Sequence, residues 1–392
     1  MLVKTSEALA KSREYYFSSK LRALEQLRRQ GKDIINLGIG NPAEQPHDEV
    51  INAFVREIMK NGVHGYQSYK GSENMLKSVS RWYDKHFGVC LPHDKSFLPL
   101  CGSKEGLSFI VQAFVNPGDE ILVPDPGYPT YQAVAKLHYA KVKYYNLTET
   151  NGYVPDFDEL DKLVSERTRL MFVNYPNMPT GAHIDSEFFD RLVKWARKHK
   201  VLVVNDNPYA MLFEKKLSIF SVAGAHDIAI ELHSLSKSHN MAGWRVGFAV
   251  AAPDYINALL KVKSNYNSGH FKPVQAAVSS ALALDNSWYK ELRQVYNNRR
   301  LYVVSTLTSL GFDASFGDEG MFVWARVPGR FGNGEDVSDW LVDKAGVFLT
   351  PGIVFGKNGD MFVRVSLAAE SAVIQKAFAR IEKVFNRKTI KL

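Results

Sequence analysis

Residues 234–247 read SLSKSHNMAGWRVG, and they directly follow the apolar run at residues 228–232. A short apolar run of this kind predicts a buried strand, so the stretch leaves the carboxyl end of that strand. In open α/β sheets, ligands bind at this edge. Lys237 lies there between two serines, and Arg245 follows. A phosphorylated aldehyde fits this combination, because lysine can hold the aldehyde as an imine while serine and arginine bind phosphate.

Apolar runs and helical patterns alternate along the middle of the chain. Besides the run at 228–232, short apolar runs occupy residues 121–123, 170–173 and 201–204. Continuous apolar strands with helices between them predict a mostly parallel sheet that helices flank on both faces. Residues 4–30 mix apolar and charged side chains in a way that indicates a helix.

Near residue 285 the pattern changes. A long helical pattern covers residues 287–310, and strand-like pieces and a last helix follow it. The 392 residues also exceed what one core usually supports. We therefore predict an α/β chain with a large domain over 46–284 and a smaller α+β domain over 285–392. The N-terminal arm, residues 1–45, is predicted to join the smaller domain.

The composition is that of an ordinary soluble protein, with 45% apolar and 23% charged residues. No long uncharged apolar stretch or signal-peptide pattern occurs, so we expect neither a membrane span nor export. Two cysteines, Cys90 and Cys101, are too few for a disulfide framework, have no metal-ligand spacing and suit a reducing cytoplasm. The net charge of +8 is spread along the chain, so nucleic-acid binding is not expected.

Three further segments could carry chemistry. Residues 206–209 read DNPY and follow a predicted strand, residues 125–129 read DPGYP and follow another, and residues 102–106 read GSKEG where a loop enters a predicted helix. Taken alone, each has an ordinary structural explanation: a turn aspartate, a proline-fixed turn with a core aromatic, and a helix N-cap.

In this order, the segments resemble the class I and II aminotransferases, which are fold-type I pyridoxal-phosphate enzymes. The resemblance runs from about Gly38 to Arg364, nearly the whole chain. It implies that Lys237 holds pyridoxal 5'-phosphate and that Asp206 pairs with the pyridine nitrogen. A protonated ring is the electron sink that makes the substrate Cα–H acidic. Tyr209 would donate to the phenolic oxygen of the cofactor.

The resemblance also implies how the cofactor is held. A phosphate cradle would combine a helix N-terminus with the lysine segment, and its residues are Gly102, Ser103, Lys104, Ser234, Ser236 and Arg245. Tyr128 would stack on the ring. Tyr66 matches a tyrosine that reaches the phosphate of a neighbouring subunit, which implies a homodimer with shared active sites.

At the substrate end, Arg364 matches the arginine that binds the substrate carboxylate, and Gly40 would approach the same carboxylate. One position departs from the family: Met178 stands where an asparagine normally donates to the phenolic oxygen, and methionine cannot donate. Asn177 or Asn174 could replace this donor, or else Tyr209 acts alone. If the donor is lost, the imine titrates at a higher pH than in a Met178→Asn variant.

The resemblance implies an aminotransferase that moves an amino group between an L-amino acid and a 2-oxo acid, and we favour an aspartate-type substrate. A carbon–sulfur β-lyase of the same fold is the alternative, because fold and cofactor do not decide the reaction. A pyridoxal-phosphate-sensing regulator would need a DNA-binding domain ahead of the enzyme-like part, and the arm before Gly38 is too short for one.

Overall fold

The structure is a computed structural model, and it describes residues 2–10, 12 and 14–386. Its central element is a seven-stranded sheet in the order β2-β8-β7-β6-β5-β3-β4. The strands are β2 (Phe97–Leu100), β3 (Glu120–Asp125), β4 (Lys141–Asn146), β5 (Thr168–Val173), β6 (Leu202–Asp206), β7 (Ala229–Ser234) and β8 (Gly247–Ala251). All neighbours from β7 to β4 are parallel, whereas β8 runs antiparallel to both β7 and β2. This confirms the mostly parallel sheet.

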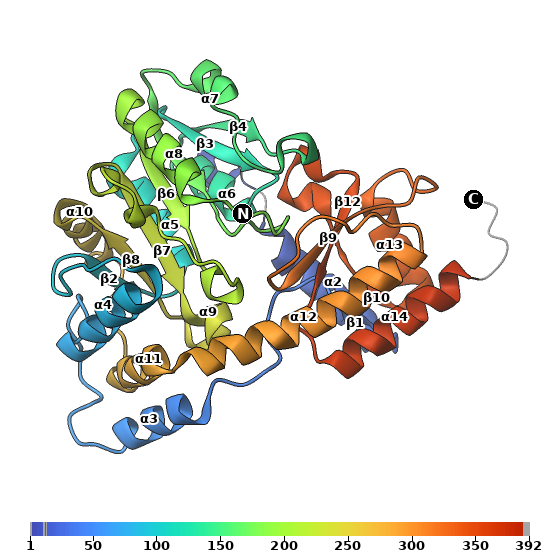
Figure 1. The fold of residues 1–392 in the computed structure, drawn as a ribbon, viewed down its shortest axis with the longest axis horizontal. Helices are drawn as coiled ribbons and strands as arrows, with labels where there is room; N and C mark the ends of the chain where they lie inside the picture. Colours follow the sequence, from blue (N-terminus) through green and yellow to red (C-terminus); the bar gives the residue numbers. More distant parts are fainter. Residues whose placement is uncertain (1, 11, 13, 387–392) are drawn as a thin grey trace.

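Helices cover both faces of the sheet (Figure 1). On one face lie α5 (Ser103–Phe114), α6 (Pro129–Leu137) and α10 (Pro253–Lys263), and on the other lie α4 (Glu73–Phe87) and α8 (Ser186–His199). Alternate residues of β5 show why its positions 170–173 are all apolar. Leu170 and Phe172 pack towards α5 and α6, whereas Met171 and Val173 pack towards α8.

A second group of elements follows α11 (Lys272–Ala283). The long helix α12 (Asn286–Ser309) runs from the edge of the large sheet to this group, as Figure 1 shows. The group contains a three-stranded antiparallel sheet in the order β11-β12-β9 and the helices α13 and α14. Their bounds are β9 (Phe322–Arg326), α13 (Gly334–Ala345), β11 (Thr350–Pro351), β12 (Phe362–Ser366) and α14 (Ser371–Phe385).

The N-terminal arm contacts this C-terminal group through β1 (Ile35–Asn36), which pairs in parallel with β10 (Val347–Phe348). The helix that follows the arm, α3 (Asp48–Ile58), instead packs against α11. The domain bounds at residues 45 and 284 stay predictions. Among the described residues, no helix has both the length and the apolarity that a membrane span requires.

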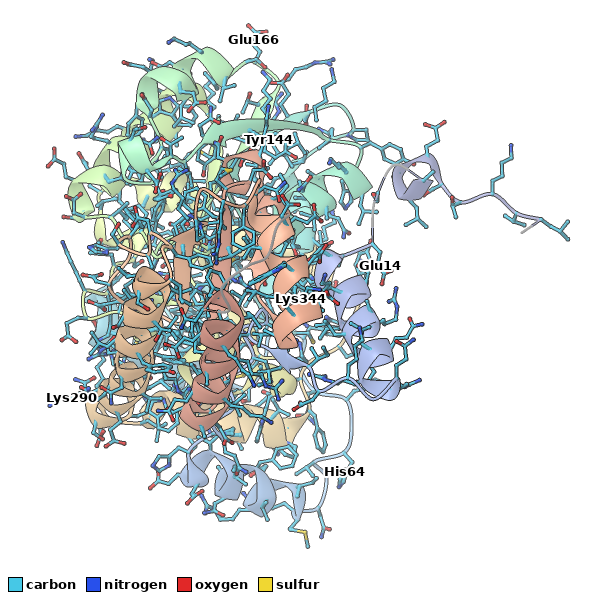
Figure 2. All side chains as sticks on the ribbon, turned by 90° about the vertical axis from the view of Figure 1, so that its right-hand side faces the viewer. Glu14, His64, Tyr144, Glu166, Lys290 and Lys344 are labelled. Atoms are coloured by element: carbon cyan, nitrogen blue, oxygen red, sulfur yellow. The ribbon has the colours of Figure 1, made fainter. Side chains whose placement is uncertain are left out.

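The single helix predicted over residues 4–30 is wrong. The described part of the arm contains a short helix, α1 (Glu7–Ala10), and a longer one, α2 (Tyr16–Arg29). Tyr15 precedes α2 with an extended backbone (φ −56°, ψ 122°), and its ring packs edge-on against Tyr128. This distant contact overrides the local helical preference. Figure 2 shows Glu14 on the outer surface just before α2.

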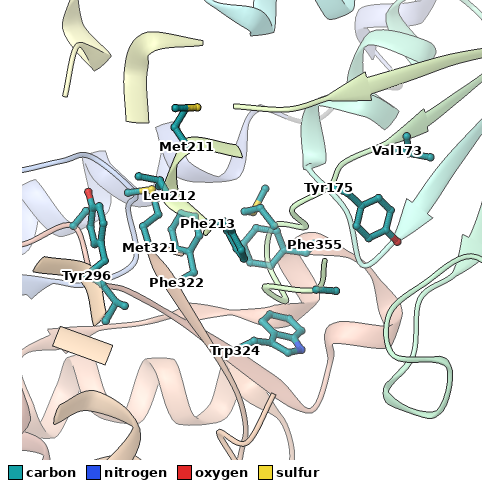
Figure 3. Close-up of a cluster of buried hydrophobic side chains, with 14 of the residues drawn as sticks. Val173, Tyr175, Met211, Leu212, Phe213, Tyr296, Met321, Phe322, Trp324 and Phe355 are labelled. Atoms are coloured by element: carbon teal, nitrogen blue, oxygen red, sulfur yellow. The ribbon is translucent and has the colours of Figure 1, made fainter. Parts of the chain in front are cut away.

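A buried apolar cluster joins the two groups of elements (Figure 3). Met211, Leu212 and Phe213, which follow β6, pack in it with Met321 and Phe322 at the start of β9. Because the side chains of this cluster are closely packed, the cluster holds β9 in a fixed position relative to the edge of the large sheet. It therefore determines where Phe322 stands beside the site.

Candidate active site

A cavity of about 520 Å³ opens at the carboxyl edge of the large sheet. One wall comes from residues at successive strand ends: Tyr128 follows β3, Asn174 follows β5, Asp206 ends β6 and Ser234 ends β7. The carboxyl ends of parallel strands meet at one edge, so residues distant in the sequence share this wall.

The opposite wall comes from the arm and the C-terminal group. It contains Tyr15, Phe17, Phe322, Phe355 and Arg364. The strand ends supply mainly polar groups and this wall supplies mainly aromatic rings. The cavity therefore has mainly apolar walls with a few polar atoms at fixed positions, as small-molecule sites usually do.

Lys237 lies in the short helix α9 (Leu235–Ser238), which Ser234 caps by accepting a hydrogen bond from the Ser236 N–H at 3.2 Å. The ammonium of Lys237 donates to the carbonyl oxygen of Gly40. Burial, with Arg364 and Arg245 as further causes, lowers the pKa of Lys237 to about 8. The side chain therefore loses its proton at mildly alkaline pH, and a neutral amine is the form that attacks an aldehyde.

Asp206 is a buried carboxylate with one satisfied oxygen. Its Oδ2 accepts a hydrogen bond from the hydroxyl of Tyr131 at 2.9 Å, and its Oδ1 has no partner among the described residues. Burial raises the pKa of Asp206 to about 7, although interactions with the hydroxyls of Tyr131 and Ser103 oppose that rise. An orphaned acceptor beside a cavity fits a cationic partner such as a protonated ring nitrogen.

Tyr131 was missed by the sequence analysis. Its ring stacks on Phe172 with centroids 4.7 Å apart, and this fixes the hydroxyl that bonds to Asp206. A signal existed, because Tyr131 lies three positions after Tyr128 and within the helix that begins at Pro129, a spacing that brings two side chains to one side. What the sequence could not show was that the second ring also faces the aspartate.

A cradle for an anion lies where α5 begins. Gly102 precedes the helix with φ 80°, and a Cβ there would collide with the guanidinium of Arg245. Arg245 is held by the carbonyls of Ala242 at 2.8 Å and Cys101 at 3.4 Å. The helix N-terminus, the Ser103 hydroxyl and this cation together suit a phosphate dianion.

The turn that carries Tyr128 is tied to the C-terminal group. The carboxylate of Asp125 accepts the backbone N–H of Lys357 at 3.0 Å and of Asn358 at 2.9 Å. The N–H of Gly127 donates to the carbonyl of Phe355 at 2.7 Å. These bonds fix the aromatic wall and the strand-end wall to each other at this point.

Arg364 is a buried cation on β12 with no carboxylate partner among the described residues. One terminal nitrogen donates to the carbonyl of Gly38 at 2.6 Å, and the other lies 3.1 Å from the sulfur of Met178. The rings of Phe322 and Phe355 lie 4.1 and 4.7 Å from the guanidinium carbon. Its Nε has no partner in residues 2–10, 12 and 14–386, and burial lowers the pKa of Arg364 to about 10. Such a group fits a carboxylate ligand.

The structure brings most of the predicted site residues together around this cavity: Gly40, Ser103, Lys104, Tyr128, Asp206, Tyr209, Ser234, Ser236, Lys237, Arg245 and Arg364. Gly102 lies directly behind Ser103 in the cradle. Tyr66 does not line the cavity of its own chain, and its side chain is 96% exposed. The individual roles assigned from the sequence stay predictions.

These residues fit pyridoxal phosphate. An amine that can be neutral, an acceptor without a partner and an anion cradle surround one cavity, as a phosphorylated pyridine aldehyde requires. When bound, the cofactor supplies the electron sink for reactions at the substrate Cα.

Comparisons with known proteins agree. Residues 32–381 match the family model described as aminotransferase class I and II. The chain is 37% identical to an LL-diaminopimelate aminotransferase of Nitratidesulfovibrio vulgaris over 96% of its own length and 98% of that protein. For an enzyme of the same name from Aquifex aeolicus, the identity is 36% over 94% and 96% of the two chains.

Solved structures show the same likeness. Substrate-bound BacF from Bacillus subtilis has a TM-score of 0.94 at 31% identity, over 99% of this chain and 100% of that chain. An aminotransferase from Staphylococcus aureus has a TM-score of 0.88 at 30% identity, over 97% and 99%. The chain therefore belongs to the class I and II aminotransferases and is a pyridoxal-phosphate-dependent transaminase of fold-type I.

Proposed function

We propose that the amino donor is an L-amino acid with a second, distal carboxylate, and that LL-diaminopimelate is the first candidate. The named relatives support this choice, because they share more than a third of their residues with the chain along almost its full length. They give no support to the aspartate-type donor favoured from the sequence or to the β-lyase alternative.

The observation that carries this proposal is the cation Lys104, which the resemblance assigns to the phosphate cradle and which we assign to the substrate instead. The other cavity cations already have candidate ligands: the cofactor aldehyde for Lys237, phosphate for Arg245 and the α-carboxylate for Arg364. The ammonium of Lys104 lies 4.0 Å above the ring of Tyr15, and within the described ranges it bonds to no carboxylate. It is therefore available for the second carboxylate of a donor.

The wall between the two ends suits a hydrocarbon chain. Phe17, Leu21 and Ile39 line the cavity together with Tyr15 and offer apolar surface. A donor whose carboxylates are separated by several methylene groups would cover that surface and release water from it, which favours binding. Aspartate has too few methylene groups to do so.

The residues divide the work of the reaction. Arg364 binds the α-carboxylate and so orients the Cα–H bond towards Lys237. The neutral amine of Lys237 would take the Cα proton and, once protonated, would give it back to the atom that is to receive it, and a pKa near 8 suits a group that both takes and gives a proton. Asp206 would hold the ring nitrogen of the cofactor and stabilise its positive charge.

The test is a single-turnover absorption experiment. The holoenzyme is mixed with one amino acid at a time, without any 2-oxo acid, and loss of the visible cofactor band is followed. We expect LL-diaminopimelate to remove the band with a higher second-order rate constant than L-aspartate, L-alanine or L-phenylalanine. A larger rate constant for aspartate would refute the proposed donor. Ammonia and pyruvate without a new amino acid would instead indicate a lyase.

We further propose that two copies of the chain form a homodimer in which Tyr66 reaches the partner's phosphate cradle. The supporting observation is the exposure of Tyr66, together with that of Met59 and Tyr69, which lie close to it in the sequence after α3. Light scattering should give the mass of a dimer. Tyr66→Phe should weaken cofactor binding without changing that mass, and a monomer with full activity would refute the shared site.

A further inference from the structure

The loop after β5 brings Met178 to the cavity position where a hydrogen-bond donor to the cofactor is expected. Met178 lines the cavity and touches Arg364 through its sulfur, which cannot donate. Two asparagines, Asn174 and Asn177, lie nearby in the same loop. Their amides are used differently, and this difference decides which one can serve the cofactor.

Asn177 is committed to the loop itself. Its Oδ1 accepts from the hydroxyl of Thr180 at 2.8 Å and from the N–H of Thr180 at 3.3 Å, while its Nδ2 donates to the carbonyl of Asn174 at 3.2 Å. It does not line the main cavity and instead borders a space of only about 10 Å³. Asn177 therefore cannot reach a ligand without unfolding this turn.

Asn174 is placed differently, because its buried side chain lines the main cavity. Its Oδ1 accepts the backbone N–H of Met178 at 2.8 Å, and its Nδ2 donates to the backbone carbonyl of Asp206 at 2.5 Å. A backbone N–H can only donate and a carbonyl can only accept, so both contacts fix the orientation of the amide.

The fixed orientation leaves one hydrogen unused. An amide nitrogen carries two hydrogens, and among the described residues the carbonyl of Asp206 is the acceptor found for Asn174 Nδ2. A buried donor without a partner is costly, so a ligand oxygen in the cavity would be favoured there. Asn174 therefore bonds to the backbone of Met178, the position that lacks a donor, and to the backbone of Asp206, the residue assigned to the ring nitrogen.

We propose that Asn174 donates its second amide hydrogen to the oxygen substituent of the cofactor ring, in place of the asparagine that Met178 replaces. This role differs from positioning Asp206, which the first hydrogen performs. The proposed role of Asn174 rests on the cofactor that this family uses, and it does not depend on which amino acid is the amino donor. The measurement below contains no amino acid, so its failure leaves the proposed donor untouched.

The experiment is a pH titration of the visible absorption band of the holoenzyme. The proton lost in this transition leaves full negative charge on the ring oxygen, and a hydrogen-bond donor stabilises that form. Asn174→Ala should therefore raise the midpoint by about 1–2 pH units, the equivalent of one hydrogen bond to a charged oxygen. Asn174→Ser serves as a second variant if the alanine variant does not fold.

The decisive step is rescue by Met178→Asn in the Asn174→Ala background. The new amide at 178 restores a donor for the ring oxygen but does not restore the bond to the Asp206 carbonyl. We expect the midpoint to return towards that of the natural protein. Asn177→Ala is the matched control, and it should lower thermal stability without moving the midpoint. An unchanged midpoint in Asn174→Ala, or a shift that Met178→Asn does not reverse, would overturn the proposal.

Discussion

Replacing Asp206 by asparagine should stabilise the cofactor-free protein while disabling the holoenzyme. Burial raises the pKa of Asp206 from an ordinary 3.8 to about 7. The folded state therefore disfavours the ionised carboxylate that predominates at neutral pH. Asparagine has the same shape, can still accept the Tyr131 hydroxyl and has no charge to desolvate.

The magnitude follows from the pKa difference. It is about 3 pH units, and each unit corresponds to about 1.4 kcal/mol, so ionised Asp206 destabilises the fold by about 4 kcal/mol. Because the folded pKa lies above the unfolded one, this cost is absent below pH 3.8, grows as the pH rises and is complete above about pH 7. The advantage of Asp206→Asn should thus be about 3 kcal/mol larger at pH 8 than at pH 5.

The assay is urea unfolding of both proteins at these two pH values after removal of the cofactor. Asp254→Asn, which removes an exposed carboxylate from α10, is the control for the loss of a surface charge. With cofactor bound the order should reverse, because the ring nitrogen loses its anionic partner. If the advantage were the same at both pH values, burial would not be the cause of the raised pKa of Asp206.

Three further predictions concern the cavity. Lys104→Met should raise KM for LL-diaminopimelate about 10-fold or more in steady-state assays, with little change for L-alanine, because only the former has a distal carboxylate. Arg364→Lys should raise KM for every donor, about 10- to 100-fold, since a single ammonium cannot replace the planar guanidinium. The rate at which cofactor recombines with the cofactor-free protein should increase as pH rises through about 8, where Lys237 becomes neutral; a flat stopped-flow profile would contradict this assignment.

The parts of the site nearest to strand ends could be predicted from the sequence. Lys237 and Asp206 follow apolar runs directly, so the strand pattern alone placed them at the carboxyl edge, and the structure brings both to one cavity. The mostly parallel sheet followed from the same runs. Strands β2, β4 and β8 were missed, and the antiparallel direction of β8 depends on its pairing with β2 and β7, which are distant in the sequence or turn back locally without a directional signal.

Contacts between distant segments could not be predicted in this way. Tyr15 interrupts the expected N-terminal helix because its ring packs against Tyr128, more than a hundred positions away. Nothing near Phe322 or Phe355 in the sequence indicates that their rings surround a guanidinium. The choice between Asn174 and Asn177 likewise depends on hydrogen bonds to Asp206 and Thr180, which only the folded loop reveals.

One physical cause links the three charged groups at the centre of the site. Burial shifts the pKa of Lys237, of Asp206 and of Arg364 in the direction that favours the neutral form, and both Asp206 and Arg364 keep a polar atom that has no partner within the described part of the chain. A protein that only had to fold would replace such groups by apolar ones, since a buried charge without a partner destabilises it. In the proposed assignment, two of these charges are matched by parts of the ligands: the ring nitrogen for Asp206 and the α-carboxylate for Arg364. Binding energy is therefore concentrated at the atoms that must be oriented, which is the arrangement that transamination requires.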